Sequence, residues 1–196
     1  MPVQPGIKPG GSPIPRLVIL SRDGVINERR PTGVRAVDEW KAIPGSLRAI
    51  ARLTSAQFHV VVATNQPGIA DGTLDGGMLA HIHAKMNGEI ARDGGRIESI
   101  FYCPHVADDK CSCRKPRPGL LLEVAKRLDV DLEGVPFIGD TSEDIEAARA
   151  AGARPILLRT GRGMETEESC AGCADVEVYD DLADAASALI ELRAAD

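Results

Sequence analysis

The stretch that decides the expected fold of this chain is Leu17-Val18-Ile19-Leu20-Ser21-Arg22-Asp23-Gly24-Val25-Ile26-Asn27. Its four consecutive branched apolar residues, 17–20, predict a short strand that is buried on both faces, as strands of parallel sheets are. The pattern then changes abruptly to small and charged residues, and Gly24 frees the backbone just past the strand. The strand therefore delivers an acid, Asp23, and a glycine at its carboxyl end.

Downstream of this stretch, short apolar runs alternate with helical patterns. We expect further strands at 58–63, 97–102, 135–138, 155–158 and 176–178. We expect one helix that starts at 44–46 and has Leu47, Ile50 and Leu53 on one face, and further helices at 74–92, 118–128, 143–151 and 182–193. Ser46 is the expected N-cap of the first helix, and His81 and His83 of the second are expected at the surface rather than as ligands. This alternation predicts an α/β protein, a three-layer, Rossmann-like parallel sheet with helices on both faces.

Length and composition bound the domain organisation. The chain has 196 residues, enough for one domain with a substantial core, which we expect to span residues 16–196. Residues 1–15 carry five prolines and three glycines and almost nothing that could be buried. We expect them to form a disordered arm.

The net charge of −6 argues against nucleic acid as a partner, although a local cluster of donors can still bind a phosphorylated substrate. No apolar run approaches the roughly 20 residues that span a bilayer, and the sequence carries no export signal. We therefore expect a cytoplasmic protein without a membrane partner, and a monomer. The odd count of five cysteines favours metal binding or free thiols over a disulfide framework.

Polar residues follow three of the predicted strands. Ser21 and Asp23 follow the first, Thr64 and Asn65 the second, and Asp140 a later one. Ligands of open parallel sheets bind at the carboxyl ends of the strands, so these residues are expected to converge on one site. Each alone would be weak evidence, because Thr, Asn and Asp also follow strands simply as turn formers.

The segment 28–44 is polar and irregular and follows the first strand directly. It is expected to lie over the site as a flap, in which Arg29, Arg30 and Arg35 could meet anionic groups of a substrate. The alternative is an ordinary solvated loop whose arginines have no such role.

A second group of ligand-type residues lies between the third strand and the third helix. Cys103, His105, Cys111 and Cys113 supply three thiols and one imidazole within eleven residues. This set matches a closed tetrahedral Zn²⁺ site, which would be structural because it leaves no open position. The alternative is three unrelated thiols. Cys170 and Cys173 lack a second ligand pair nearby, and plain thiols are the favoured interpretation there.

The opening stretch resembles the first motif of the haloacid-dehalogenase (HAD) phosphatases, Asp-x-Asp-Gly-[Thr/Val], except that Ser21 replaces the first carboxylate. That carboxylate is the nucleophile of the family. The resemblance implies that Ser21 occupies the nucleophile position and that Asp23 is the general acid/base. It also implies a catalytic Mg²⁺ held by Ser21, Asp23 and Asp140, with Asp144 orienting the site or capping the following helix.

The other family motifs supply contacts to the phosphate. By resemblance, Thr64, Asn65 and Gln66 form the second motif and donate a hydroxyl and backbone N–H groups. Lys115 is similar to the third-motif lysine, a point charge on the phosphate, and Arg114 resembles a residue that recognises the substrate. Phosphoryl transfer needs just such a set of positioned donors and charges.

The zinc loop narrows the resemblance to the D-glycero-D-manno-heptose 1,7-bisphosphate phosphatases and the related histidinol-phosphate phosphatases. The match runs from 17 to 163 in the order of the family, without room for a cap domain, so a capless, open site is expected. It implies hydrolysis of a small phosphorylated sugar, heptose 1,7-bisphosphate, on the way to lipopolysaccharide. Histidinol phosphate is the alternative substrate, and a non-catalytic sugar-phosphate-binding protein is the alternative function.

Ser21 is expected to impair turnover, because a phosphoserine ester is far harder to cleave than the acyl phosphate formed by a carboxylate. Three explanations compete: an engineered or accidental change, a natural pseudo-enzyme that binds without hydrolysis, and a serine pathway with Asp23 as the base. The other motif residues are all present, which favours the first explanation. In each case the chain is expected to bind its substrate and turn it over poorly.

Overall fold

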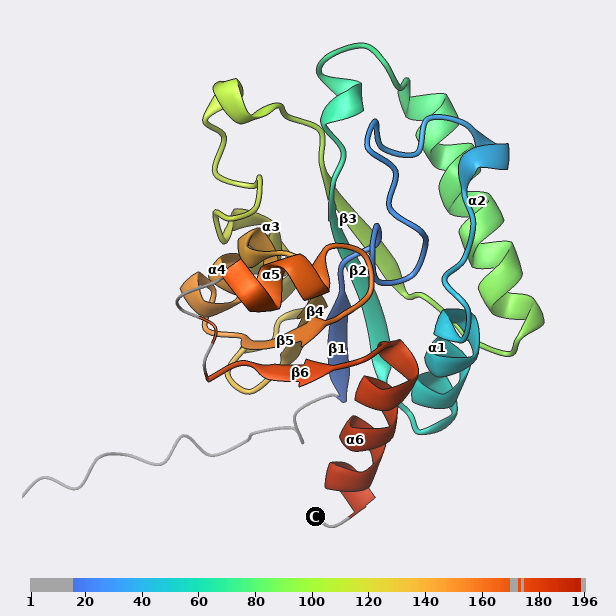
Figure 1. The fold of residues 1–196 in the computed structure, drawn as a ribbon, viewed down its shortest axis with the longest axis vertical. Coiled ribbons are helices and arrows are strands. Elements are labelled where there is room, and N and C mark those ends of the chain that lie inside the picture. The colour runs from blue at the N-terminus through green and yellow to red at the C-terminus, as the bar shows by residue number, and fades with distance from the viewer. Residues whose placement is uncertain (1–15, 170–172, 174, 195–196) are drawn as a thin grey trace, which may run out of the picture.

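The apolar run at the start of the opening stretch is the central strand of a parallel sheet. The computed structural model describes residues 16–169, 173 and 175–194, and its strands all run in the same direction (Figure 1). The strands are β1 (Leu17–Leu20), β2 (His59–Asn65), β3 (Ser99–Cys103), β4 (Pro136–Gly139), β5 (Arg154–Leu158) and β6 (Glu177–Tyr179). Their order across the sheet, β3-β2-β1-β4-β5-β6, confirms the predicted Rossmann-like parallel sheet.

Helices cover both faces of this sheet, which confirms the predicted three layers (Figure 1). One face carries α1 (Ser46–Ser55), α2 (Gly76–Arg92) and α6 (Leu182–Ala194), and the other carries α3 (Gly119–Leu128) and α4 (Ser142–Ala150). A further helix, α5 (Gly163–Ser169), follows β5, and short 3₁₀ turns lie at Val37–Glu39, Pro67–Ile69 and Ala107–Asp109. Together these elements leave no room for a cap domain among the described residues.

The side chains of β1 explain why its sequence is apolar throughout. Val18 and Leu20 point into the core beneath α1, α2 and α6, whereas Leu17 and Ile19 point into the core beneath α3 and α4. Alternation along a strand sends successive side chains to opposite faces, so a strand covered on both sides needs apolar residues at every position. All four residues are buried.

The site is placed by the neighbours of β1. Leu20 pairs with Val62 of β2 on one side and with Ile138 of β4 on the other. The chain moves from β1 to β2 in one direction across the sheet and reaches β4 in the other. The carboxyl end of β1 therefore lies at a topological switch point, where open α/β sheets bind their ligands.

One local expectation is wrong, and one helix was not predicted. Ser46 is the first residue of α1 rather than its N-cap; the cap is Gly45, which has a φ of +86°. The buried Ser46 hydroxyl instead lies 2.7 Å from the carbonyl oxygen of Ile26 and 2.8 Å from that of Ile43, and so fastens α1 to the segment after β1. The helix α5 was not predicted, because its sequence has no apolar periodicity.

Some expectations stay untested. The predicted arm at residues 1–15 lies outside the described residues, and the assignment of 16–196 to a single domain remains a prediction. Within the described ranges, every helix is too short or too polar to cross a membrane.

Candidate active site

The polar residues that follow β1, β2 and β4 meet at one edge of the sheet. They surround a cavity of about 340 Å³, whose lining includes Ser21, Asp23, Thr64, Lys115 and Asp144. These side chains come from positions up to 123 residues apart in the chain, so only the fold brings them together. The convergence expected from the strand ends is present for Ser21, Asp23, Thr64 and Asn65, whereas the buried Asp140 pairs with Arg29 and does not itself line the cavity.

Ser21 and Lys115 are in direct contact at the base of this cavity. The Nζ of Lys115 donates to Ser21 Oγ at 3.1 Å, to the carbonyl oxygen of Ala63 at 3.0 Å and to Asp144 Oδ1 at 2.6 Å. Lys115 and Asp144 are both buried. Burial acts to raise the pKa of Asp144, and the neighbouring Lys115 ammonium holds that pKa below its usual value. Asp144 is therefore held as a carboxylate.

Replacing Lys115 by methionine (Lys115→Met) should lower the free energy of unfolding by about 3–5 kcal/mol, because it leaves the Asp144 carboxylate buried without a counter-charge. Urea denaturation measures this loss. The double variant Lys115→Met/Asp144→Asn removes both charges and should be more stable than Lys115→Met alone. Equal stability of the single and double variants would show that the pair is not the source of the loss.

Asp23 is held as a carboxylate by three side chains. Arg22 Nη2 lies 3.0 Å from its oxygens, Asn27 Nδ2 donates at 3.0 Å and Gln66 Nε2 donates at 3.1 Å. Burial acts to raise the pKa of Asp23, but the Arg22 charge and the Asn27 hydrogen bond more than offset it and lower that pKa. Asp23 is therefore a carboxylate at neutral pH.

The residues after β2 divide between the cavity and its support. Thr64 Oγ1 accepts from Gln66 Nε2 at 2.9 Å, so Gln66 links Thr64 to Asp23. The Asn65 side chain clamps the main chain of Lys115, donating to its carbonyl oxygen at 3.1 Å and accepting from its N–H at 3.2 Å. Asn65 therefore fixes the position of the Lys115 main chain, and both polar atoms of its side-chain amide already have hydrogen-bond partners.

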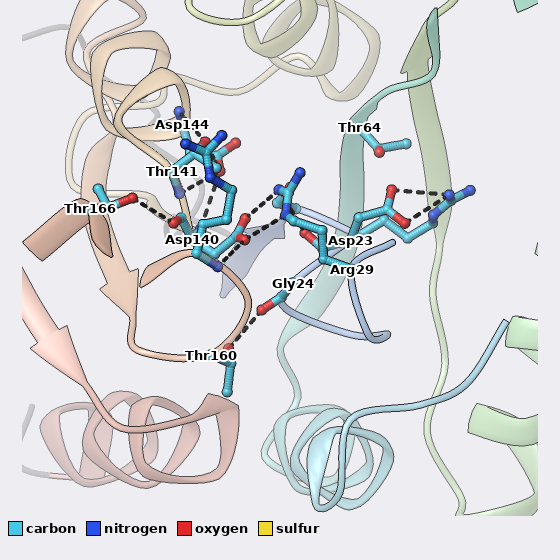
Figure 2. A network of polar contacts seen from close by, with 12 residues as sticks. Asp23, Gly24, Arg29, Thr64, Asp140, Thr141, Asp144, Thr160 and Thr166 are labelled. Atoms are coloured by element: carbon cyan, nitrogen blue, oxygen red, sulfur yellow. Dashed lines mark hydrogen bonds and ion pairs between the residues drawn. The ribbon is translucent and has the colours of Figure 1, made fainter. Parts of the chain in front are cut away.

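Asp140, which follows β4, is fully buried between two glycines (Figure 2). A Cβ atom at Gly24 would lie 2.0 Å from Asp140 Oδ2, and one at Gly161 would lie 2.3 Å from the same oxygen. Both glycines also have a positive φ, which side chains rarely adopt. The two positions require glycine so that the Asp140 carboxylate can lie against the main chain that follows β1.

Arg29 of the flap binds Asp140 in a bidentate pair. Its Nε donates to Oδ2 at 2.9 Å and its Nη2 to Oδ1 at 2.8 Å, and Nη2 also lies 3.2 Å from the main-chain oxygen of Asp23 (Figure 2). Burial acts against the charge of Arg29, but its hydrogen bond to Asp140 raises the pKa of the guanidinium above its ordinary value. The flap arginines were expected to meet anionic groups of a substrate. Arg29 does reach the site, but its partner there is Asp140, a carboxylate of the chain itself.

The rest of the flap also lies where it was expected. Residues 29–35 line the cavity, and so does Arg114 from the segment after the cysteines. Arg114 Nη1 donates to the carbonyl oxygen of His105 at 3.2 Å, and Arg30 lies 3.6 Å from Glu39. Trp40, the single tryptophan, is fully buried in the core and fastens the far end of the flap.

His83, which was expected at the surface, is half-buried and supports the site. Its Nε2 lies 3.2 Å from Nη1 of Arg22, which is fully buried, and its ring packs edge-on to Tyr102. Burial, together with the charge of Arg22, lowers the pKa of His83 to about 4. His83 is therefore neutral and accepts a hydrogen bond from the arginine that holds Asp23. His81 is exposed, as expected.

Acid should destabilise the fold through His83. The folded state keeps it neutral down to a pH of about 4, whereas an unfolded chain protonates it near pH 6.5. Unfolding therefore takes up a proton between these values, and stability falls as the pH falls through this window. From pH 7.5 to pH 5, the loss from this group should be about 2 kcal/mol.

Urea unfolding of the parent and of His83→Gln at both pH values tests this expectation. Glutamine can accept from Arg22 without titrating, so the variant should lose about 2 kcal/mol less on acidification. The control is His81→Gln, which removes an exposed histidine of the same helix and should behave like the parent. An unchanged pH dependence in His83→Gln would contradict the expectation.

The four predicted zinc ligands form one cluster. The ligand atoms of Cys103, His105, Cys111 and Cys113 all lie within 4.8 Å of one another. The Cys111 sulfur lies 3.7 Å from that of Cys103 and 3.6 Å from that of Cys113, while His105 Nδ1 lies 3.5 and 3.4 Å from the Cys103 and Cys113 sulfurs. A tetrahedron with Zn–S bonds of about 2.3 Å has edges of about 3.7 Å. The cluster could therefore hold a zinc ion.

This cluster adjoins the residues that reach the cavity. The N–H of Arg114 donates to the sulfur of Cys111 at 3.3 Å, and Arg117 Nη1 donates to the carbonyl oxygen of Cys111 at 2.5 Å. The position of Arg114, and of Lys115 after it, thus depends on the geometry of the cysteines.

The second cysteine pair was expected to be two plain thiols. Cys173 is buried and disulfide-bonded, so this expectation is wrong for Cys173. Cys170 lies outside the described residues. The spacing of Cys170 and Cys173 in the sequence did not predict a disulfide bond, because it showed only that no further metal ligands lie nearby.

The parallel sheet, its strand order and the polar residues at its switch point fit the HAD class of hydrolases, and the similarity to known proteins shows that the chain belongs to that class. The family described as HAD-hydrolase-like matches residues 112–185. Two proteins named D-glycero-beta-D-manno-heptose-1,7-bisphosphate 7-phosphatase are similar along nearly their whole length. The one from Bordetella bronchiseptica is 48% identical over 90% of this chain and 98% of its own. The one from Pseudomonas aeruginosa is 46% identical over 89% of this chain and 98% of its own.

Solved structures agree with these relatives. The chain matches a crystal structure of D,D-heptose 1,7-bisphosphate phosphatase from B. bronchiseptica complexed with magnesium and phosphate, with a TM-score of 0.88, 48% identity and coverage of 90% of this chain and 98% of that one. The corresponding enzyme from Burkholderia thailandensis matches with a TM-score of 0.71, 38% identity and coverage of 89% and 97%. The chain belongs to the heptose-1,7-bisphosphate phosphatase family of the HAD superfamily.

Proposed function

We propose that this chain binds the 7-phosphate of D-glycero-β-D-manno-heptose 1,7-bisphosphate in the cavity at the end of β1 and hydrolyses it slowly. The observation that supports this most is the meeting of Ser21, Thr64 and Lys115 in one cavity. A hydroxyl, a second hydroxyl and an ammonium suit the oxygens of a phosphate monoester. The identity of the sugar in this proposal is taken from the names of the relatives.

In this proposal each residue has a defined task. Ser21 occupies the nucleophile position, and Lys115 holds its hydroxyl and opposes charge on the phosphate. Thr64 and the main chain of Asn65 bind phosphate oxygens, Gln66 keeps Thr64 and Asp23 in register, and Arg114 contacts the sugar end of the substrate. Asp23 passes the proton to and from the leaving oxygen. The slow step is the departure of a serine alkoxide from phosphorus.

The oxygens of Asp140, Asp23 and Ser21 suit a hard divalent cation in their chemistry. A magnesium ion held by these residues would neutralise charge on the phosphoryl oxygens. Its binding requires that Arg29 release Asp140, because the guanidinium engages both carboxylate oxygens. The zinc site, by contrast, needs no such change, and we assign it a structural role because its four protein ligands leave no open position.

We further infer that the chain acts as a cytoplasmic monomer without nucleic acid or membrane partners. Its net charge of −6 disfavours a polyanionic partner. The three free thiols of the zinc cluster favour a reducing compartment, whereas the disulfide bond of Cys173 does not. The residues 16–196 are proposed to act as a single domain.

Isothermal titration of the parent chain with heptose 1,7-bisphosphate and with histidinol phosphate tests the proposed substrate. The bisphosphate should bind at least about tenfold more tightly, because Arg114 and the flap arginines can meet its second phosphate. Lys115→Met should weaken binding of both compounds about equally, since each carries one phosphate that needs this charge. Tighter binding of histidinol phosphate would move the assignment to the other substrate, and binding of neither would refute the proposed site.

A further inference from the structure

Arg29 occupies a position within the proposed phosphatase site that the proposed function does not explain. Its guanidinium reaches both oxygens of Asp140 and the main-chain oxygen of Asp23, at 2.8–3.2 Å (Figure 2). Asp140 has no exposed surface, whereas Arg29 keeps 33% of its side chain exposed and lines the cavity. Arg29 therefore lies between Asp140 and the space that a ligand would enter.

The oxygens around Arg29 already have proton donors. Asp140 Oδ1 accepts from Arg29, and Oδ2 accepts from Arg29 and from the N–H of Arg162 at 3.0 Å. Ser21 Oγ accepts from Lys115. A Mg²⁺ ion needs such oxygens as inner ligands at about 2.0–2.1 Å, which a guanidinium in hydrogen-bond contact excludes. Metal and Arg29 therefore compete for the same carboxylate.

The three carboxylates around Arg29 already have cationic partners. Asp23, Asp140 and Asp144 are each paired with one cation, at 3.0, 2.8 and 2.6 Å respectively. The cations are Arg22, Arg29 and Lys115. Ser21 contributes no charge. A divalent cation added to this neutral set would gain little Coulomb energy and would meet the charge of Arg29 at close range.

We propose that Arg29 is the resident cation of this site and takes the place of Mg²⁺, so that a phosphate group binds without metal. This proposal rests on the proposed function, since it assumes that phosphate enters the cavity. Among the hydrogen bonds of the described residues, none uses Nη1 of Arg29, so this group is available to a ligand. The fork of the guanidinium would then hold Asp140 on one side and a phosphate oxygen on the other.

The test is to measure binding of inorganic phosphate and of Mn²⁺ to the parent, Arg29→Gln, Arg29→Lys and Arg162→Gln. Buffers are freed of divalent metal by a resin rather than by added chelator, which keeps zinc in place. Phosphate binding is titrated by calorimetry with and without about 5 mM MgCl₂. Binding of Mn²⁺ alone is followed by its electron paramagnetic resonance signal. The control, Arg162→Gln, removes a guanidinium that pairs with Glu165 and leaves the main-chain bond to Asp140.

The parent should bind phosphate with an affinity that Mg²⁺ changes less than about twofold. Arg29→Gln should lose about tenfold or more in phosphate affinity without Mg²⁺, regain it with Mg²⁺, and bind Mn²⁺ at least about tenfold more tightly than the parent. Arg162→Gln should match the parent. Arg29→Lys keeps a point charge but cannot bridge both oxygens of Asp140, so its phosphate and Mn²⁺ affinities should lie between those of the parent and Arg29→Gln. This variant preserves the test if Arg29→Gln does not fold.

Two results would overturn the proposal: a parent chain that binds phosphate only with Mg²⁺, or equal Mn²⁺ affinity in the parent and Arg29→Gln. If no variant binds phosphate under any condition, the proposed function fails. The Mn²⁺ measurement then still decides the role of Arg29, because it involves no phosphate.

Discussion

Ser21→Asp is expected to raise the rate of phosphate release from heptose 1,7-bisphosphate by about 10⁴-fold at millimolar Mg²⁺, the scale on which loss of a nucleophile acts in other hydrolases. A carboxylate at this position forms an acyl phosphate, whose carboxylate leaves readily when water attacks. The serine hydroxyl can form only a phosphate ester, from which an alkoxide must depart. The measurement is the initial rate of phosphate release by the parent and the variant.

The matched control is Ser21→Asn, which has the shape of the aspartate variant without its charge and should stay as slow as the parent. Adding Arg29→Gln to Ser21→Asp should lower the Mg²⁺ concentration needed for half the maximal rate, because Asp140 is then free. A folded Ser21→Asp protein that binds the bisphosphate and releases no more phosphate than the parent would contradict the assignment of Ser21 to the nucleophile position.

Loss of zinc is expected to have the second large effect. The purified chain should carry one zinc ion, and Cys113→Ser should remove it and lower the melting temperature by about 10 °C, since structural zinc sites contribute directly to folding free energy. The loop from Cys103 to Cys113 packs few apolar side chains of its own, so the metal supplies much of its stability. Elemental analysis and thermal unfolding measure the two quantities.

Cys113→Ser should also bind phosphate more weakly, because Lys115 follows Cys113 by two residues and depends on the loop for its position. The control is Ser112→Ala, which lies between two ligands, has no ligand atom in the cluster and should retain zinc. A chain that holds no zinc after expression with ample metal, and is equally stable as Cys113→Ser, would refute a structural zinc site.

Much of the fold follows from local patterns in the sequence. The apolar run 17–20 predicts a strand covered on both faces because every position of such a strand is buried, and each side chain of β1 indeed enters one of the two cores. The cysteine and histidine spacing likewise predicts the zinc cluster, because its ligands lie close together along the chain. Where the signal is local and periodic, the sequence suffices.

The parts that the sequence did not predict depend on distant residues. Arg29 and Asp140 are 111 positions apart, and their contact exists only because Gly24 and Gly161 let the carboxylate approach the flap. His83 looked like a surface residue because nothing in its helix indicates that it would face Arg22, 61 positions away. Ser46 was mistaken for a cap because the carbonyl groups that it meets lie in an earlier segment.

The Arg29 contact also bears on the origin of Ser21. The presence of all the other motif residues favoured an isolated change in a working enzyme. A resident guanidinium on Asp140 instead suits a site that holds phosphate without metal. The two explanations differ in one observable property, since only an isolated change predicts that Ser21→Asp alone reaches full rate at low Mg²⁺.

The central claim is that Ser21, Thr64 and Lys115 surround a single phosphate. Because turnover is expected to be slow, a crystal of the parent chain soaked in heptose 1,7-bisphosphate should capture the intact substrate. We predict its 7-phosphate within hydrogen-bond distance of Ser21 Oγ, Thr64 and Lys115 Nζ. A phosphate bound elsewhere on the chain, with this cavity empty at saturating substrate, would contradict the account.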